Sequence, residues 1–323
     1  MKKILLLAVI SLMMVGCNKS SGGVDVDKDR VFNVGICQLV THDALDAATK
    51  GFKDELTRRL GADHVKVDEQ NAAGDPGVCS TIANSFVSKK VDLIMANATP
   101  ALQAASNATL NIPILGTSIT EYGVALGIED FKGYTGQNIS GTSDLAPLDE
   151  QANMVLELVP NAKNVGILYC SAEANSLYQV NVVKAELEKK GLTVKTLSFS
   201  DSNDLSSVLN AGAVGLDVLY IPTDNVCASN AETIDAICQQ KNLPVVAGEE
   251  NLCKGCGAFT LSISYYNIGV KTGEMAAKII KEGAHVSKMK VQFDESPVKK
   301  YNPTICERLG ITPPEGFVAI SQE

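Results

Sequence analysis

The stretch Ile167-Leu168-Tyr169-Cys170-Ser171-Ala172-Glu173-Ala174-Asn175-Ser176-Leu177-Tyr178-Gln179 joins a short apolar run to an amphipathic segment. The apolar run predicts a buried strand, and Leu177, Val180, Val183 and Leu187 then recur at helical spacing. The turn between them is a strand-to-helix junction, where free helix N–H groups attract anions. Ligands of open α/β sheets bind just beyond such strand ends. Taken alone, the turn is better explained as an ordinary loop with an Asn or Ser cap, so its recurrence elsewhere decides its meaning.

The same strand-helix unit recurs in two series along the chain. In the first series we expect strands at 31–37, 64–69, 91–96 and 112–116. We expect a first helix that is capped at 41–43 and ends at Gly61, and two further helices at 76–89 and 99–108. In the second we expect strands at 164–169, 192–199, 218–222, 244–247 and 257–263, with helices at 148–158, 173–190, 203–214, 227–240 and 267–281. Strict alternation of this kind predicts an α/β fold with parallel, doubly wound sheets.

Two β-α series predict two lobes. The Gly-rich segment 127–142 interrupts the β-α alternation between them. The helix at 267–281 and the tail from Lys288 are more than the second sheet needs. We therefore expect the chain to cross between the lobes more than once, which makes a hinge that closes on a ligand. The expected ranges are 31–140 plus about 266–297 for the first lobe, and 141–265 plus about 298–323 for the second.

The N-terminus carries an export signal. Residues 1–16 combine Met1-Lys2-Lys3 with an apolar run that is short for a bilayer span. Met14-Val15-Gly16-Cys17 is similar to a bacterial lipobox, in which Cys17 is lipidated and becomes the first mature residue. The polar range 17–30 suits a tether, and two or more acyl groups make such an anchor stable. An ordinary signal peptide with a chance cysteine is the alternative.

Composition narrows the function classes. The formal charge of the 323-residue chain is −9, and it becomes −11 once Lys2 and Lys3 leave with the signal peptide. An acidic chain without a Lys/Arg block argues against nucleic acid as a partner. No Ser-His-Asp arrangement, nucleophile elbow or Walker A motif is present, so we expect no enzyme. With three histidines and no Cys/Asp/His cluster near His42, we expect no metal site and no cofactor.

Eight of the nine cysteines remain after Cys17, and their pairing is open because eight allow 105 connectivities. The lone Cys253-Lys254-Gly255-Cys256 motif is weak evidence for zinc, which usually needs two such pairs. A loop disulfide or two free thiols explains it better, and a thiol oxidoreductase is a further alternative.

Five short stretches carry a resemblance to a known family. They are Thr41-His42-Asp43-Ala44-Leu45-Asp46 with Gly51-Phe52, Ala98-Thr99-Pro100-Ala101, Glu173-Ala174-Asn175-Ser176 with Gln179-Val180, Pro222-Thr223-Asp224-Asn225, and Gly248-Glu249-Glu250. From about Val31 onward, the chain resembles the ABC-transporter substrate-binding lipoproteins that include tryptophan- and tyrosine-binding members. The resemblance implies a type I periplasmic-binding-protein fold with two Rossmann-like lobes, three crossings and a ligand in the cleft.

The family resemblance also implies a role and partners. It implies a monomer on the extracytoplasmic face of the cell membrane that delivers an amino acid to an ABC permease with its ATPase. Two departures bear on the ligand. Asp43 stands where members commonly have Pro after the His, and Thr117-Ser118-Ile119-Thr120-Glu121-Tyr122 replaces a loop that often carries Thr-Asp-Pro.

A free amino acid would need three kinds of partner. For its carboxylate we expect the free amides and hydroxyl at Thr99, with Thr117 and Ser118 adding donors. For its ammonium we expect Asp224, with Glu249 as a second acidic option, while Asn175 and Ser176 bridge both groups. The alternatives are that Thr99 merely caps its helix and that Asp224 caps the helix near Cys227.

The side chain would need an apolar wall and one polar contact. His42 is expected to stack on an aromatic ring or to hydrogen-bond a phenol. The resemblance adds Ala44, Leu45, Pro100, Ala101 and Asn225 to the expected binding residues. Further ring contacts are possible from a set of tyrosines, Tyr122, Tyr169, Tyr178, Tyr265 and Tyr266.

We therefore expect a lipid-anchored receptor for tyrosine, phenylalanine or tryptophan. The alternatives are a surface adhesin or sensor with the same fold, or a receptor for another amino acid, a sugar or a purine.

Overall fold

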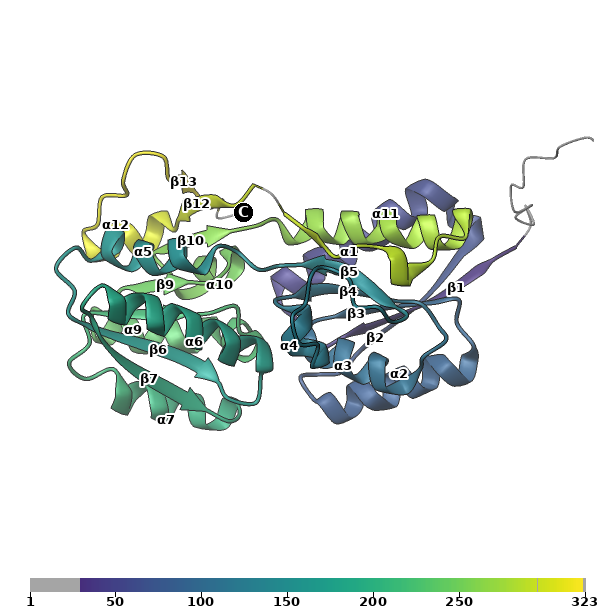
Figure 1. The fold of residues 1–323 in the computed structure, drawn as a ribbon. Coiled ribbons are helices and arrows are strands. Elements are labelled where there is room, and N and C mark those ends of the chain that lie inside the picture. The colour runs from purple at the N-terminus through teal and green to yellow at the C-terminus, as the bar shows by residue number, and fades with distance from the viewer. Residues whose placement is uncertain (1–29, 295, 322–323) are drawn as a thin grey trace, which may run out of the picture.

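The structure, a computed structural model, describes residues 30–294 and 296–321, so the expected signal peptide, Cys17 and nearly all of the tether lie outside it. The described chain forms two lobes side by side, each a sheet between layers of helices (Figure 1). Within this part of the chain, no helix combines the length and apolar character needed to cross a membrane.

The first lobe contains a six-stranded parallel sheet in the order β11-β5-β4-β3-β1-β2. Its strands are β1 (Phe32–Gln38), β2 (Val65–Asn71), β3 (Leu93–Asn97), β4 (Ile114–Ile119), β5 (Ile139–Ser143) and β11 (Gln292–Phe293). Its helices are α1 (Asp43–Leu60), α2 (Pro76–Lys89), α3 (Thr99–Ala108), α4 (Tyr122–Leu126) and α11 (Tyr265–Glu282), with short 3₁₀ turns at Ala62–His64 and Val286–Lys288.

The second lobe contains a seven-stranded sheet in the order β13-β12-β10-β9-β8-β6-β7, in which β12 is antiparallel to β10. Its strands are β6 (Asn164–Cys170), β7 (Thr193–Phe199), β8 (Val218–Ile221), β9 (Val245–Ala247), β10 (Phe259–Ser262), β12 (Val298–Tyr301) and β13 (Val318–Ala319). Its helices are α5 (Leu148–Leu158), α6 (Ala174–Lys189), α7 (Ser202–Gly212), α8 (Asn225–Ser229), α9 (Ala231–Gln240), α10 (Glu250–Cys256) and α12 (Pro303–Leu309).

The chain passes between the sheets three times, after β5, after β10 and after β11. These crossings run along one side of the molecule in Figure 1. The predicted α/β architecture of two doubly wound lobes with three crossings is therefore confirmed. All of β5 belongs to the first sheet, whereas the expected division at residue 140 would cut this strand.

Three helical details differ from the sequence-based expectation. The helix expected at 227–240 is two helices, α8 and α9, separated at Asn230. The short helices α4 and α10 were not expected. Both carry a glutamate at the N-cap, Glu121 and Glu249, whose carboxylate accepts backbone N–H groups in place of the usual Ser, Thr, Asp or Asn.

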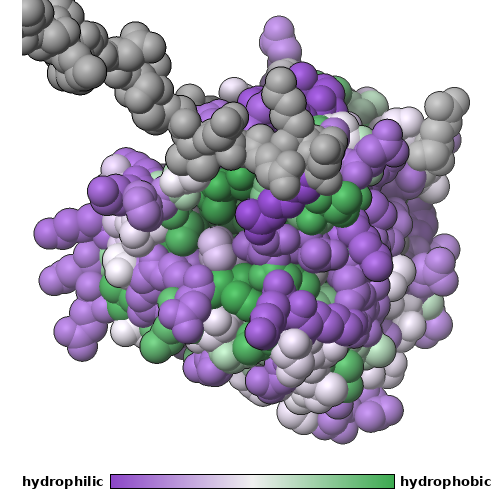
Figure 2. All heavy atoms as spheres, turned by 90° about the vertical axis from the view of Figure 1, so that its right-hand side faces the viewer, coloured by the Kyte–Doolittle hydropathy of each residue, from purple (hydrophilic) through white to green (hydrophobic). Residues whose placement is uncertain are grey.

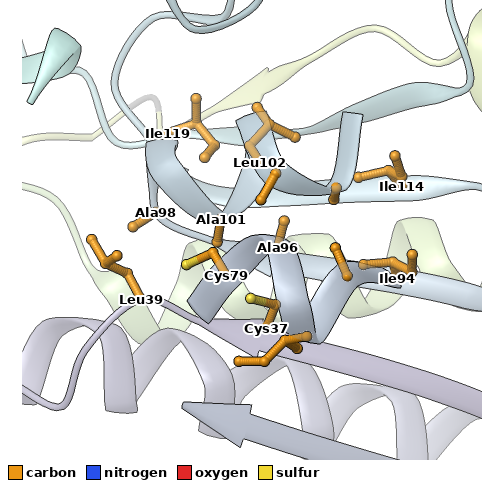
Figure 3. Packing of buried hydrophobic residues seen from close by; sticks show 14 of the residues in the cluster. Cys37, Leu39, Cys79, Ile94, Ala96, Ala98, Ala101, Leu102, Ile114 and Ile119 are labelled. Carbon is orange, nitrogen blue, oxygen red and sulfur yellow. The ribbon is translucent and has the colours of Figure 1, made fainter. Parts of the chain in front are cut away.

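Each sheet is buried on both faces. In the first lobe, one apolar cluster lies against α2 and α3 and another against α1 and α11. Figure 3 shows part of the former, with the thiols of Cys37 and Cys79 close together between β1 and α2. All eight cysteines of the described residues are buried and free, so the open question of the CxxC motif resolves in favour of free thiols. The outer end of the first lobe is mostly hydrophilic, with smaller apolar areas (Figure 2).

Helices α1 and α11 pack with their backbones in close approach. A Cβ atom built on Gly269 would lie 2.1 Å from the carbonyl oxygen of Ala48, and one on Gly51 would lie 2.2 Å from that of Tyr266. Because backbone atoms cannot move aside as a flexible side chain can, these positions tolerate no side chain without separation of the helices. The contact matters for the site because α1 begins beside His42 and α11 begins at Tyr265.

We expect Gly269→Ala to destabilise the protein by about 1–3 kcal/mol, the usual cost of overpacking. The midpoint of thermal unfolding, measured by calorimetry, should fall by about 2–4 °C for each kcal/mol. Asn267→Ala, at an exposed position of the same helix, is the matched control and should leave the midpoint nearly unchanged. Equal midpoints for the two variants would contradict the close-packing interpretation.

Candidate functional site

The carboxyl ends of strands from both sheets face one another across a small cavity between the lobes. Its lining residues are His42, Leu45, Ser118, Thr120, Asp144, Asn175, Thr223, Asp224, Asn225, Ala228, Glu249 and Tyr265. The cavity volume is about 10 Å³, which is the space of roughly one water molecule. The lobes are therefore closed upon it.

One direct polar contact between the lobes lies at this cavity. Nε2 of His42, which precedes α1, is 3.3 Å from Oδ1 of Asn225, the first residue of α8. Desolvation lowers the pKa of His42, although the bond to Asn225 opposes this shift, so the imidazole is neutral at pH 7. Its buried Nδ1 has no hydrogen-bond partner among the described residues.

Glu173 organises the second-lobe side of the site. Its carboxylate accepts the Nδ2–H of Asn225 at 2.6 Å, the Nδ2–H of Asn175 at 3.0 Å and the backbone N–H of Val226 at 3.1 Å. These bonds tie the turn after β6 to the turn after β8. Burial raises the pKa of Glu173 to about 7, and the nearby charge of Asp224 adds to the shift.

Asp224 is engaged by the backbone. Its Oδ1 accepts the N–H of Cys227 at 2.9 Å, and its Oδ2 accepts the N–H of Cys170 at 2.7 Å. Ser176 also hydrogen-bonds this carboxylate. The geometry thus supports the capping alternative for Asp224, because both oxygens already hold the turns together.

Asp144 differs from Asp224 in having an oxygen to spare. It lies in the first crossing, directly after β5, and its Oδ2 accepts the hydroxyl proton of Tyr265 at 2.8 Å. Its Oδ1 is buried and has no hydrogen-bond partner among the residues that the structure describes. Only 4% of Asp144 is exposed, and this burial raises the pKa of its carboxyl group.

Glu249 adds a third carboxylate to the lining. Its oxygens accept the N–H groups of Asn251, at 2.7 Å, and of Leu252, so it caps α10. Burial raises its pKa to about 7. Each carboxylate oxygen has two lone pairs, so these caps leave capacity for a further donor.

Two uncharged polar residues of the lining, Ser118 and Asn175, carry atoms without a hydrogen-bond partner among the described residues. Oγ of Ser118 and Oδ1 of Asn175 are both buried, and neither has a partner among the described residues. Ser118 also has a φ of 56°, a left-handed conformation that is uncommon for a residue with a side chain. Unsatisfied buried polar atoms are rare, so their gathering at one cavity indicates a site for a polar ligand.

The cavity brings together seven of the expected binding residues, His42, Leu45, Ser118, Asn175, Asp224, Asn225 and Glu249. The other six, Ala44, Thr99, Pro100, Ala101, Thr117 and Ser176, do not line it. The hydroxyl of Thr117 lies 3.2 Å from that of Thr142 within the sheet, and Thr99 is buried at the start of α3. Pro100 lines the neighbouring groove instead.

Sequence reasoning did not assign a binding role to four lining residues, Thr120, Asp144, Thr223 and Ala228, and it named Tyr265 only as one of five possible ring contacts. Asp144 could have been found as the acid that directly follows a buried strand, had the strand been expected to end at Ser143. Of the tyrosines considered as ring contacts, Tyr265 lines the cavity, whereas Tyr122 packs against Phe131 and donates to the carbonyl of Thr142.

A groove of about 510 Å³ opens beside the cavity and shares Asn225 with it. Its wall is largely apolar and includes Leu39, Val40, Pro76, Pro100 and Val226. Neither the cavity nor the groove has a Lys or Arg side chain among the described residues that line it. The cavity therefore has an acidic lining, and the groove beside it combines apolar residues with the acids Asp75, Glu173 and Asp201.

The CxxC thiols do not line the cavity, and their burial does not favour the reactive thiolate form. Cys253 and Cys256 are buried in α10, where their thiols donate to the carbonyls of Gly257 and Leu252. Desolvation raises both pKa values, and a reactive cysteine needs a lowered one.

Comparison with known proteins places this architecture in context. A curated tyrosine-binding protein of Clostridioides difficile (strain R20291) is 34% identical over 310 residues, which is 92% of this chain and 89% of that protein. A structure from Streptococcus pneumoniae, described as an ABC domain in complex with L-Trp, is 31% identical. It aligns with a TM-score of 0.85 over 90% of this chain and all of that chain.

The arrangement of the lobes matches one relative better than another. The ligand-free, open structure of a substrate-binding protein with adhesive properties from Clostridium difficile is 35% identical. It covers 91% of this chain and all of that chain, with a TM-score of only 0.69. The higher score with the L-Trp complex agrees with lobes that are closed on the cavity.

The predicted type I periplasmic-binding-protein fold is confirmed by these structural relatives. The family model of ABC transporter substrate-binding proteins matches residues 33–323, which is nearly all of the described chain. Its relatives are solute-binding proteins, in line with the expectation of a non-enzymatic function. The chain belongs to the family of ABC transporter substrate-binding proteins.

Proposed function

We propose that this protein is an extracytoplasmic, lipid-anchored receptor that binds tyrosine, phenylalanine or tryptophan between its lobes and delivers it to an ABC permease with its ATPase. The observation that carries the proposal is the unpartnered, buried carboxylate oxygen of Asp144 at the cavity. The tyrosine-binding and L-Trp-bound relatives support the ligand class.

The ammonium group of the ligand is assigned to Asp144, with Glu249 as its second acidic contact. An ammonium has three N–H donors, and a charge-assisted bond to a buried carboxylate is about twice as strong as a neutral one. Asp144 replaces Asp224 in this role, because Oδ1 of Asp144 has no hydrogen-bond partner among the described residues, whereas the carboxylate of Asp224 accepts two backbone N–H groups and the hydroxyl of Ser176.

The aromatic ring is assigned to the apolar groove. The inner cavity is too small for a ring, and the groove adjoins it at Asn225. Binding then needs the lobes to open, admit the ligand and settle around it. Motion at the three crossings provides this closure.

Adhesion is a second candidate, because one 35% identical relative is described as having adhesive properties. The two roles are compatible, since adhesion would use the outer surface and solute binding the cleft. Binding of the purified protein to host-cell monolayers tests adhesion, and a signal no higher than that of an unrelated lipoprotein would exclude it.

Titration calorimetry with the twenty amino acids tests the ligand, and we expect binding by at least one aromatic amino acid. Asp144→Asn should weaken that binding by about 10–100-fold, because a bond to a charged group contributes roughly 1.5–3 kcal/mol. Binding of a sugar or purine in place of every amino acid would sink the proposal.

Asp224→Asn is the matched variant that separates binding from stability. It replaces an acceptor of two backbone N–H groups, so we expect a lower midpoint of thermal unfolding. Asp144→Asn should keep or raise the midpoint, because it removes a buried carboxylate that lacks a cationic partner. If instead Asp144→Asn lowers the midpoint and Asp224→Asn keeps or raises it, the ammonium would be assigned to Asp224.

Affinity for the amino acid should rise with pH. Burial raises the pKa of Glu249 to about 7 and raises that of Asp144, which faces the hydroxyls of Tyr265 and Thr120. An ammonium favours the ionised carboxylates, so binding releases protons and weakens as the pH falls below about 7. Calorimetry in buffers of different ionisation enthalpy measures this release, and proton uptake would contradict it.

The lipid anchor is tested separately at Cys17. We expect the natural chain to incorporate a palmitate analogue and to sediment with membranes, and Cys17→Ala to appear in the medium without label. If the natural chain takes up no label, Cys17 is not lipidated and the protein would be a secreted receptor with an ordinary signal peptide.

A further inference from the structure

Two thiols face each other inside the first lobe. Cys37 lies on β1 and Cys79 on α2, and both are free thiols that belong to one apolar cluster. Figure 3 shows their sulfur atoms close together beside Ala98 and Ala101. Helix α1 and strand β2 separate the two residues in the chain, so it is the fold that brings these thiols together.

The two thiols are each other's polar partner. Both residues are 0% exposed and neither lines the cavity or the groove, so the proposed ligand does not use them. A hydrogen bond joins their side chains, with the thiol of Cys37 as the donor to the sulfur of Cys79. The contact therefore places two sulfur atoms next to each other in an otherwise apolar interior.

Cys79 differs from every other described cysteine in its ionisation. The hydrogen bond from Cys37 lowers the pKa of Cys79, although burial and the charge of Asp75 oppose this shift, and the same bond raises the pKa of Cys37. Burial raises the pKa of the remaining six, Cys170, Cys227, Cys238, Cys253, Cys256 and Cys306. A lowered pKa favours the thiolate, which is the form that attacks a disulfide.

We propose that Cys37 and Cys79 form a disulfide that links β1 to α2 when the chain folds in the presence of an organic disulfide. The contact between thiols from two separate elements carries the inference. It assigns a covalent modification site in the first lobe, beyond the proposed function, and it does not depend on which ligand the cleft binds.

The reaction is an exchange with an organic disulfide. The thiolate of Cys79 attacks one sulfur of the oxidant, which forms a mixed disulfide and releases the first thiol of the oxidant. Cys37 then loses its proton, and its thiolate attacks the sulfur of Cys79 and displaces the second thiol. The protein thus loses two hydrogen atoms with their electrons, and the oxidant gains both as it is reduced to two thiols.

Burial determines when this exchange takes place. Because neither thiol is exposed, an oxidant reaches the pair only while α2 is detached from β1, either in the folding chain or during local opening. Extracytoplasmic compartments can be oxidising enough for disulfides to persist. Once α2 has packed, the same burial protects the bond from reductants.

The cross-link would hold one wall of the groove. Leu39 and Val40 follow Cys37 closely, Pro76 lies one helical turn before Cys79, and all three line the groove. The bond would also close a loop that contains α1 and β2, and closing a loop of this size restricts the unfolded chain. We therefore expect the oxidised form to be the more stable one.

Refolding of the full mature chain tests the inference, with Cys17→Ala to remove the ninth thiol. The reduced, unfolded chain is refolded in a buffer of oxidised and reduced glutathione, remaining thiols are alkylated, and peptides are identified by mass spectrometry. We expect one linked peptide pair, Cys37 with Cys79, and alkylation at the other six cysteines. Calorimetry should place the midpoint of thermal unfolding roughly 5–10 °C above that of the reduced chain.

Matched variants identify the thiols responsible. Cys37→Val and Cys79→Val should each abolish the linked peptide pair and the dependence of the midpoint on a reductant. Cys253→Val, which removes an equally buried cysteine of the second lobe, should keep both. If either first-lobe variant fails to fold, peptide mapping of the chain with both cysteines still decides. Alkylation of both thiols after refolding, or their linkage to other cysteines, would overturn the inference.

Discussion

Burial of carboxylates without a cationic side chain is the constraint on which this molecule depends. Taking an ionised carboxylate out of water is unfavourable unless hydrogen bonds or an opposite charge compensate for it. Glu173, Asp224 and Glu249 meet this requirement with backbone and amide N–H groups at the starts of helices. Asp144 accepts the hydroxyl of Tyr265 at Oδ2 and faces the hydroxyl of Thr120, but its Oδ1 has no direct partner among the described residues. The atom that still lacks a partner, Oδ1 of Asp144, therefore lies between the lobes.

Two of the carboxylates that accept hydrogen bonds, Asp224 and Glu173, also connect elements of the second lobe. Asp224 bonds to the end of β6 and the start of α8, and Glu173 joins the turns after β6 and β8. Glu173 also accepts the side-chain amides of Asn175 and Asn225 and so fixes the positions of these two residues at the cavity. These hydrogen bonds hold the second-lobe wall in position in the closed structure, and a wall that is already ordered loses less entropy on binding.

Much of the architecture follows from the sequence, because strand and helix periods depend on local geometry. The alternation of the two series predicts both sheets, and strand ends predict His42, Asn175 and Glu249 at the cavity. Asp144 escapes this reasoning, and Tyr265 is named only among five possible ring contacts, because both lie beside crossings whose path depends on how whole lobes pack. The role of Asp224 depends on Cys170, a partner 54 residues away.

The position of Asp144 links charge to motion. It sits in the first crossing, and its hydrogen bond to Tyr265 joins it to the helix that begins just after the second crossing. A cation at its free oxygen would therefore act on two of the three connections between the lobes. The neutral His42–Asn225 contact closes the seam from the other side but supplies no charge. In an empty closed cleft, Oδ1 of Asp144 lacks a partner among the described residues and burial disfavours its charged form, whereas a cleft closed on an ammonium supplies both a donor and an opposite charge. The ligand therefore favours closure by its differential affinity for the two states.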